Sequence, residues 1–323
     1  MTRRALLTSA FAALALAQKP EVSPTDLSLI DDPAVPNELF FIREHFPRPD
    51  VLSSASWKLS VTGKEYSFDD ILAMTGKTIP VTVECAENST GGGLVSHAEW
   101  RGVPIASLLP KDAKPPFVKL VSADGYSRTV PGSKALHPDT IVAYSMNGEK
   151  LPITHGFPLR AIVPGWYGMD AVKWLRRIEL PENEDQSHAY VRRVRSFFGT
   201  RDAEPVTAMQ VKSVFTRPQD GAILTKRRFI LRGMAWAGEN RIAKVEVSVD
   251  GAATWQTAKL DSGPVEYSWL PWSFDWKIPH AGEYTLSVRA KDDKGREQPQ
   301  QRATDRSDVY EWNDWQTVKV TAV

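Results

Sequence analysis

Cys85 is the only cysteine in this chain of 323 residues, so it is the only side chain that can offer a thiolate. A single cysteine excludes an internal disulfide. It also excludes zinc and iron–sulfur sites built from cysteines alone, because those sites need several thiolates. Since a lone cysteine is most often a small buried hydrophobic residue, a chemical role for Cys85 has to be argued from its surroundings.

Those surroundings are a strand pattern and a glycine-rich loop. Residues 79–85 alternate and are rich in β-branched side chains, which predicts a strand that ends at the cysteine. Residues 88–93 include three consecutive glycines and predict a loop whose backbone comes close to another group. The Cys85 sulfur can therefore face a cofactor that approaches this backbone.

Two cations, Arg160 and Lys173, occur among apolar residues. A buried cation is costly unless an anion pairs with it, so both positions indicate an anionic partner. The other basic runs, residues 192–195 and 226–228, are typical of solvated surface, and no role is assigned to them as runs. The apolar neighbours of the two cations are Phe157, Leu159, Ile162, Val172 and Trp174.

The elements that carry these residues indicate a mixed α+β first half with few long helices. Ser67 followed by Asp70 predicts the cap of a short helix. Residues 117–130 predict two strands around Asp124-Gly125, and Asn147-Gly148 predicts a tight hairpin turn.

From about residue 204 the pattern changes to short alternating strands separated by turn signals such as Asp250-Gly251. This pattern predicts an all-β antiparallel sandwich of immunoglobulin type. We therefore expect one domain over residues 25–203 and a second over residues 204–323. The strands expected in the second domain are residues 211–215, 228–236, 245–249, 255–260, 284–290 and 315–320.

The N-terminus, residues 1–17, predicts an export signal. Arg3 and Arg4 precede an apolar run over residues 5–17, which ends in a small-residue cleavage pattern. The adjacent arginines fit a twin-arginine signal, and an ordinary secretory signal remains the alternative. We expect a periplasmic or otherwise exported protein with no membrane span after signal removal, because the run is too short for a span and no longer one follows.

The charge balance bears on two classes of partner. Lys plus Arg number 40 and Asp plus Glu number 39, which gives a net charge of +1. Such a balance gives no electrostatic reason to expect nucleic acid or an anionic membrane as partner.

Five segments, in order, resemble the sulfite oxidase family of molybdopterin-dependent oxidoreductases. The resemblance covers most of residues 35–180, and the second half resembles the immunoglobulin-like dimerisation domain of that family. It implies a molybdenum–molybdopterin cofactor and a homodimer. The segments are residues 40–45 (FFIREH), 83–88 (VECAEN), 143–148 (AYSMNG), 155–160 (HGFPLR) and 163–168 (VPGWYG), the last followed by 172–175 (VKWL).

The resemblance also implies the roles of individual residues. Cys85 becomes the protein ligand to molybdenum, and a soft thiolate suits a metal that carries sulfur donors. Arg43 and Cys85 become the catalytic residues, and Asp124 accepts hydrogen bonds from the pterin. The residues implied to hold the cofactor are Phe41, Arg43, His45, Cys85, Asp124, His155, Arg160, Val172 and Lys173.

The sulfite pocket of the family is only partly matched. Arg43 corresponds to one of its arginines, whereas the late arginine of the second domain is replaced near Asp308. The family tyrosine follows a double arginine; here Tyr190 precedes Arg192-Arg193 and stands on the wrong side. If Arg195 points inward, it can replace the lost charge and sulfite binding is retained. If it points outward, a neutral sulfoxide or another small oxo compound fits better.

The function expected is oxygen-atom transfer to or from a small oxo-substrate, with sulfite dehydrogenase as the leading named activity. The sequence has no Cys-x-x-Cys-His motif, so we expect no haem in this chain and an external electron carrier such as a cytochrome c. The alternatives are a sulfoxide-type reductase on the same scaffold, an exported β-rich binding protein with a decayed cofactor site, and a cysteine hydrolase that uses Cys85 with His97 or His155.

Overall fold

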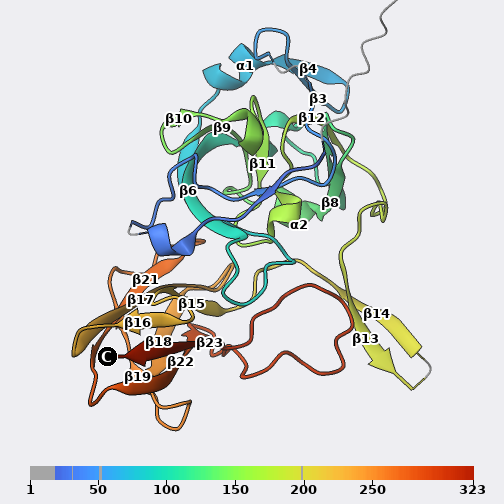
Figure 1. Ribbon diagram of the computed structural model, residues 1–323. Coiled ribbons are helices and arrows are strands. Elements are labelled where there is room, and N and C mark those ends of the chain that lie inside the picture. The colour runs from blue at the N-terminus through green and yellow to red at the C-terminus, as the bar shows by residue number, and fades with distance from the viewer. Residues whose placement is uncertain (1–18, 31, 51–52, 198) are drawn as a thin grey trace, which may run out of the picture.

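Strands dominate the computed structural model, which describes residues 19–30, 32–50, 53–197 and 199–323. Figure 1 shows two halves, with the first half above the second and a long hairpin projecting to one side. The expected export signal, residues 1–17, lies outside the described residues. Among the residues described, no helix is long and apolar enough to cross a membrane.

The first half is built on two five-stranded sheets. The sheet that carries Cys85 has the order β10-β9-β6-β5, with β11 pairing β9, and the other has the order β4-β3-β12-β7-β8. The bounds of the first sheet are β5 Lys77–Glu84, β6 Val95–Pro104, β9 Ile141–Met146, β10 Glu149–Lys150 and β11 Arg160–Ile162. Those of the second are β3 Lys58–Val61, β4 Lys64–Ser67, β7 Phe117–Ser122, β8 Ser127–Pro131 and β12 Leu175–Glu179.

Helices in the described part of the first half are short. Ser67 and Asp70 form the predicted capping box, in which each side chain accepts from the other residue's backbone N–H. The strand predicted to end at Cys85 is confirmed as β5, and the two strands around Asp124-Gly125 are confirmed as β7 and β8. The helical elements are α1 Phe68–Ala73, α2 Gly132–Ala135, and the 3-10 turns η1 Leu27–Leu29, η2 Ile105–Leu108, η3 Ile153–His155 and η4 Gly168–Asp170.

Two small strand pairs complete the first half. Strand β1 (Val22–Ser23) pairs with β2 (Ile42–Arg43), which places Arg43. Strands β13 (Val191–Ser196) and β14 (Gly199–Pro205) form the projecting hairpin in Figure 1. The loop between β22 and β23 of the second half runs beside this hairpin, since Arg195 N–H donates to Asp305 O at 2.7 Å.

The second half contains two further sheets, with orders β15-β17-β21-β20 and β16-β23-β22-β18-β19. Its apolar core lies among residues of both sheets. The strands are β15 Lys212–Arg217, β16 Ala222–Leu224, β17 Arg228–Trp236, β18 Ile242–Ser248, β19 Gln256–Thr257, β20 Lys259–Leu260, β21 Leu270–Lys277, β22 Gly282–Asp292 and β23 Gln316–Ala322.

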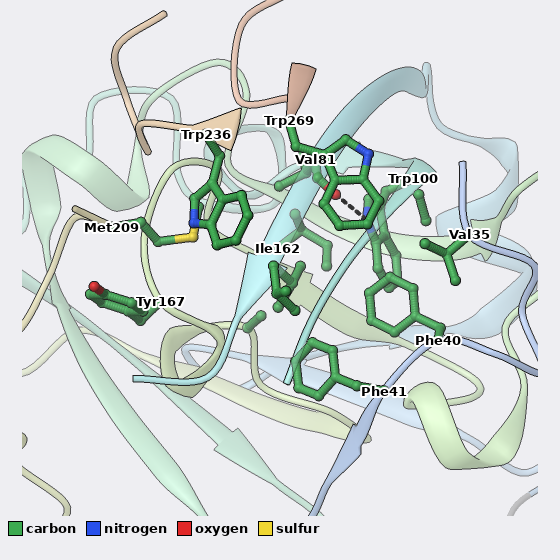
Figure 2. Close-up of a cluster of buried hydrophobic side chains, with 14 of the residues drawn as sticks. Val35, Phe40, Phe41, Val81, Trp100, Ile162, Tyr167, Met209, Trp236 and Trp269 are labelled. Carbon is green, nitrogen blue, oxygen red and sulfur yellow. Dashed lines mark hydrogen bonds between the residues drawn. The ribbon is translucent and has the colours of Figure 1, made fainter. Parts of the chain in front are cut away.

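One apolar cluster joins the two halves. Figure 2 shows Trp236 and Trp269 of the second half beside Val81 and Trp100 of the first. The rings of Trp236 and Trp269 are 6.4 Å apart, and Trp100 Nε1 donates to Val81 O at 3.4 Å. Because buried tryptophans contribute large apolar areas, this shared cluster binds the halves into one packed unit around β5.

Candidate active site

A single cavity in the first half brings together every residue implied to hold the cofactor. It encloses about 790 Å³ of empty space, including its open mouth. The loops and strand ends that line it come from both sheets of the first half. The implied residues on its wall are Phe41, Arg43, His45, Cys85, Asp124, His155, Arg160, Val172 and Lys173.

Cys85 enters this cavity directly after the last residue of β5. Its backbone N–H donates to Leu94 O at 2.9 Å, which closes the glycine-containing loop behind it. Burial raises the pKa of the Cys85 thiol to about 11. A thiol in this setting stays protonated at neutral pH unless a metal ion binds the sulfur in place of the proton.

His155, Arg160 and Lys173 form a second part of the wall, here called the cation group. Gly156, with φ +111°, lets the chain reverse so tightly that a Cβ at this position would lie 3.1 Å from the backbone of Lys173. Arg160 Nη1 donates to His155 O at 3.2 Å, and Lys173 Nζ donates to Thr154 O at 3.0 Å. The glycine turn thus holds two positive side chains together.

The positive charge of the cation group is only partly offset by nearby carboxylates. In the part of the chain that the structure describes, Arg160 donates only to backbone carbonyls and forms no ion pair with a carboxylate. Burial lowers the pKa of Arg160 to about 9, and burial together with Arg160 lowers the pKa of Lys173 to about 7. Glu44 lies 3.6 Å from Lys173 but also pairs with Arg48. A buried site of this kind favours an added anion such as a phosphate.

The remaining implied residues line other parts of the same cavity. Asp124 sits in the turn between β7 and β8 and accepts the N–H of Tyr126 at 2.9 Å. His45 is exposed at the cavity and packs its ring 5.5 Å from that of Tyr126. Phe41 and Val172 are buried and give apolar walls. Such a mix of apolar wall and few polar groups is typical of a cofactor pocket.

Arg43, Cys85, Glu87 and Tyr190 form the part of the wall here called the thiol group. Arg43 Nη2 donates to Glu87 Oε2 at 3.1 Å, and both side chains are about one-third exposed. Burial alone would lower the pKa of Arg43, but the hydrogen bond and the negative charge of Glu87 outweigh burial, so this pKa is raised. Glu87 was missed by sequence reasoning, and it offsets the one arginine that matches the family's oxyanion site.

Tyr190 also lines the cavity, although it precedes the double arginine that the family's tyrosine follows. Its ring lies 5.4 Å from that of Tyr310 and 5.2 Å from the guanidinium of Arg128. Because no tyrosine follows Arg192-Arg193 in the sequence, we expected no counterpart of the tyrosine in the family's sulfite pocket. In the fold, Tyr190 stands just before β13, where the chain leaves the cavity wall.

Arg195 points outward. It is exposed on β13 and does not line the cavity. Near Asp308, Arg302 and Arg306 supply positive charge, but each donates to the Asp308 carboxylate at 2.7 Å. These arginines do not line the cavity either. The substrate side of the cavity is therefore close to charge-neutral.

The hydrolase alternative lacks a base beside the thiol. His97 is buried under the second half, where its Nδ1 lies 3.0 Å from Thr82 Oγ1, and it does not line the cavity. His155 lines the cavity, but its Nε2 donates to Asn37 O at 2.9 Å, and burial, then Arg160, lowers its pKa to about 3. Among the described residues, no histidine hydrogen-bonds Cys85, so the geometry does not support a Cys–His pair.

Comparison with known proteins agrees with this site. The family model described as the oxidoreductase molybdopterin binding domain matches residues 45–189, and that described as the Mo-co oxidoreductase dimerisation domain matches residues 203–322. The mitochondrial sulfite oxidase of Homo sapiens is 31% identical over 87% of this chain and 60% of its own length. That of Mus musculus is 30% identical over 82% of this chain and 57% of its own length.

A solved structure is similar over nearly the whole chain. The sulfane dehydrogenase SoxCD from Paracoccus pantotrophus superposes with a TM-score of 0.85 at 26% identity, covering 94% of this chain and 86% of that one. This chain spans somewhat more than half the length of the two sulfite oxidases above. The two family models and the relatives of 30% identity or above agree with the residues that line the cavity. The chain therefore belongs to the sulfite oxidase family of molybdopterin-dependent oxidoreductases.

Proposed function

We propose that this protein is an exported molybdenum-cofactor enzyme that moves an oxygen atom to or from a small, weakly charged oxo compound of sulfur. The observation that carries the proposal is one cavity that unites a lone, partly buried thiol with two cations. Among the described residues, Arg160 pairs with no carboxylate, and Lys173 shares Glu44 with Arg48. A molybdenum–molybdopterin cofactor fits this donor set, because its metal accepts a thiolate and its phosphate needs fixed cations.

Each part of the wall then has a task. Cys85 would hold the metal, and the cation group would hold the phosphate. Asp124 would accept from the pterin, with His45 beside it and with Phe41 and Val172 packing against the ring system. The cofactor supplies oxygen-atom transfer and two-electron storage. The chain supplies binding, orientation and a dry apolar wall.

The thiol group would receive the substrate. Tyr190 carries a phenol whose pKa is raised by burial, so its O–H stays protonated and can donate a hydrogen bond to a substrate oxygen. Arg43 can donate as well, but its charge is offset by Glu87. Binding a doubly charged oxyanion such as sulfite requires net positive charge, and this wall offers little of it.

A neutral sulfoxide or a similar compound therefore fits the thiol group better than sulfite does. Sulfite dehydrogenase remains the reference activity, because sulfite oxidases are among the relatives. The reductase direction, in which a sulfoxide gives up its oxygen, uses the same wall.

Assembly and location are also proposals. The dimerisation domain over residues 203–322 supports a homodimer, and its two-sheet architecture supports an immunoglobulin-like sandwich. Arg3, Arg4 and the apolar run after them support export, and an external carrier such as a cytochrome c would take the electrons. Light scattering at micromolar concentration that shows a monomer would refute the dimer.

The deciding experiment compares sulfite with neutral sulfoxides on the molybdenum-loaded chain. Steady-state assays would use a dye acceptor for oxidation and a reduced dye for oxygen removal. We expect a higher kcat/KM for the neutral compounds. A kcat/KM for sulfite within the usual enzyme range of ~10⁴–10⁸ M⁻¹s⁻¹, and above that of every neutral compound, would overturn the substrate proposal. Purified chain that binds no molybdenum would overturn the enzyme proposal in favour of a binding protein.

A further inference from the structure

We infer that the second half of the chain positions Cys85, through a buried ion pair between Lys212 and Glu84. Glu84 is the last residue of β5 and directly precedes Cys85. Its carboxylate is fully buried and accepts Lys212 Nζ at 2.6 Å. Lys212 begins β15 in the second half, and its side chain is only 1% exposed. The pair thus crosses between the halves one residue away from the proposed metal ligand.

The Glu84 carboxylate has a complete set of partners. Trp236 Nε1 of the second half donates to Oε2 at 2.8 Å, and Asn88 Nδ2 donates to Oε1 at 3.0 Å. Lys212 Nζ also reaches Asn88 O at 3.3 Å. A buried ion pair is tolerated where further hydrogen bonds satisfy its remaining atoms. One lysine of the second half therefore holds the residue before Cys85 and the end of the turn after it.

Neighbouring positions are held from the second half in the same way. Thr82 Oγ1 accepts the N–H of Trp269 at 2.7 Å, and the N–H of Thr82 donates to Tyr267 O at 2.8 Å. On the other side of the cysteine, Ala86 O accepts the N–H of Glu311 at 2.8 Å. Trp269, which makes one of these bonds, and Trp236, which donates to Glu84, belong with Val81 to the apolar cluster drawn in Figure 2.

These contacts determine the direction of the thiol. Because successive residues of an extended chain point to opposite sides, Glu84 facing the second half directs Cys85 toward the cavity. A metal ligand must be held close to its productive position by residues that do not themselves touch the metal. The second half is therefore a structural part of the metal site, in addition to the dimerisation named for its family. Glu84 and Lys212 are positioning residues in this scheme.

The inference rests on the proposed role of Cys85 as ligand, so one test does not need the cofactor. Cys85 is the only thiol, and its alkylation rate in the full-length chain made without cofactor reports on its exposure once the rate is measured over a range of pH and divided by the thiolate fraction. Lys212→Met and Glu84→Gln should each speed alkylation at least about tenfold, because removing one partner leaves an uncompensated buried group. Lys212→Arg, which keeps the charge, should restore much of the slow rate.

Asp292→Asn is the matched control. Asp292 is also a buried carboxylate, paired with Arg296 at 2.6 Å, but its side-chain contacts stay within the second half. The control should lower the melting temperature while leaving Cys85 alkylation unchanged. If Lys212→Met and Glu84→Gln lower the melting temperature without faster alkylation, the inference is wrong. Should a single variant fail to fold, the double variant Glu84→Gln/Lys212→Met, which buries no unpaired charge, must still show the faster rate.

The loaded protein gives the second measurement. In molybdenum-loaded Lys212→Met, the visible sulfur-to-metal absorption band and the Mo(V) electron paramagnetic resonance signal should shift, whereas the Asp292→Asn spectra should match those of the unmodified protein. Unchanged spectra in Lys212→Met would overturn the inference. A chain that binds no molybdenum would refute the proposed function alone, since the alkylation rates would still decide whether the second half positions Cys85.

Discussion

The cation group and the thiol group share one cavity but differ in charge balance. In the cation group, Arg160 is buried and Lys173 is partly buried, and little negative charge lies beside them. In the thiol group, Arg43 is matched by Glu87. The first part is thus prepared for an anion that stays bound, and the second for a substrate that carries little charge. The difference indicates that cofactor binding and substrate choice are set by separate residues of the same wall.

The largest expected effect comes from Cys85→Ser, which removes the soft ligand that the thiol group contributes. We expect near-complete loss of turnover with retained fold, because a serine hydroxyl is a hard, weakly acidic donor. Steady-state assays and circular dichroism check both points. Full turnover in this variant would show that Cys85 is not the ligand to molybdenum.

Arg160→Ala and Lys173→Ala test the cation group. Each should weaken cofactor retention by about 10- to 100-fold, because a charge-assisted bond to a buried phosphate is worth ~1.5–3 kcal/mol. Molybdenum and pterin content of the purified variants measures the effect. Arg177→Ala, which removes an exposed cation paired with Glu179, is the control and should keep full content. Normal content in both test variants would contradict the assigned roles.

The cation group should also make the cofactor-free chain sensitive to acid. His155 has a pKa of about 3 in the fold, below its usual value near 6.5, because it is buried beside Arg160. The unfolded chain then binds more protons than the folded chain between these pH values, so stability is lost as pH falls from 6.5 toward 3. At pH 4 the loss should be on the order of 3 kcal/mol. Denaturant titrations of His155→Gln should show a flatter pH dependence, and an unchanged slope would contradict the account.

Glu87→Gln tests the thiol group and should have the smallest effect. The variant frees the charge of Arg43, so kcat/KM for sulfite should rise. Since the pair is about one-third exposed, the gain should not exceed about fivefold, equivalent to ~1 kcal/mol. A neutral sulfoxide should show no comparable change. A fall in kcat/KM for sulfite would mean that Glu87 does not oppose anions.

Much of the cavity could be predicted from short segments of sequence, because its residues lie at strand ends and turns. Cys85 after an alternating strand and Asp124 at a glycine turn are examples. Arg160 among apolar residues correctly indicated burial, and Lys173 is partly buried. What could not be predicted were pairings between distant segments. Glu87 meets Arg43 across 44 residues.

Other features missed by sequence reasoning have the same cause. Tyr190 enters the cavity only because of the path that the chain takes before β13. The charge of Lys212 is matched by Glu84 across 128 residues, so no local pattern indicated its burial. Strands β6 and β21 were also not predicted, although they are central in their sheets. Local patterns identify elements, whereas charge pairing across the fold decides the chemistry of the site.

Molybdenum K-edge X-ray absorption of the loaded chain, beside that of Cys85→Ser, tests the central claim most directly. The account predicts molybdenum in both samples when the cation group is intact, with one fewer sulfur neighbour of the metal in the variant. Identical sulfur coordination in the two samples would show that Cys85 does not bind the metal.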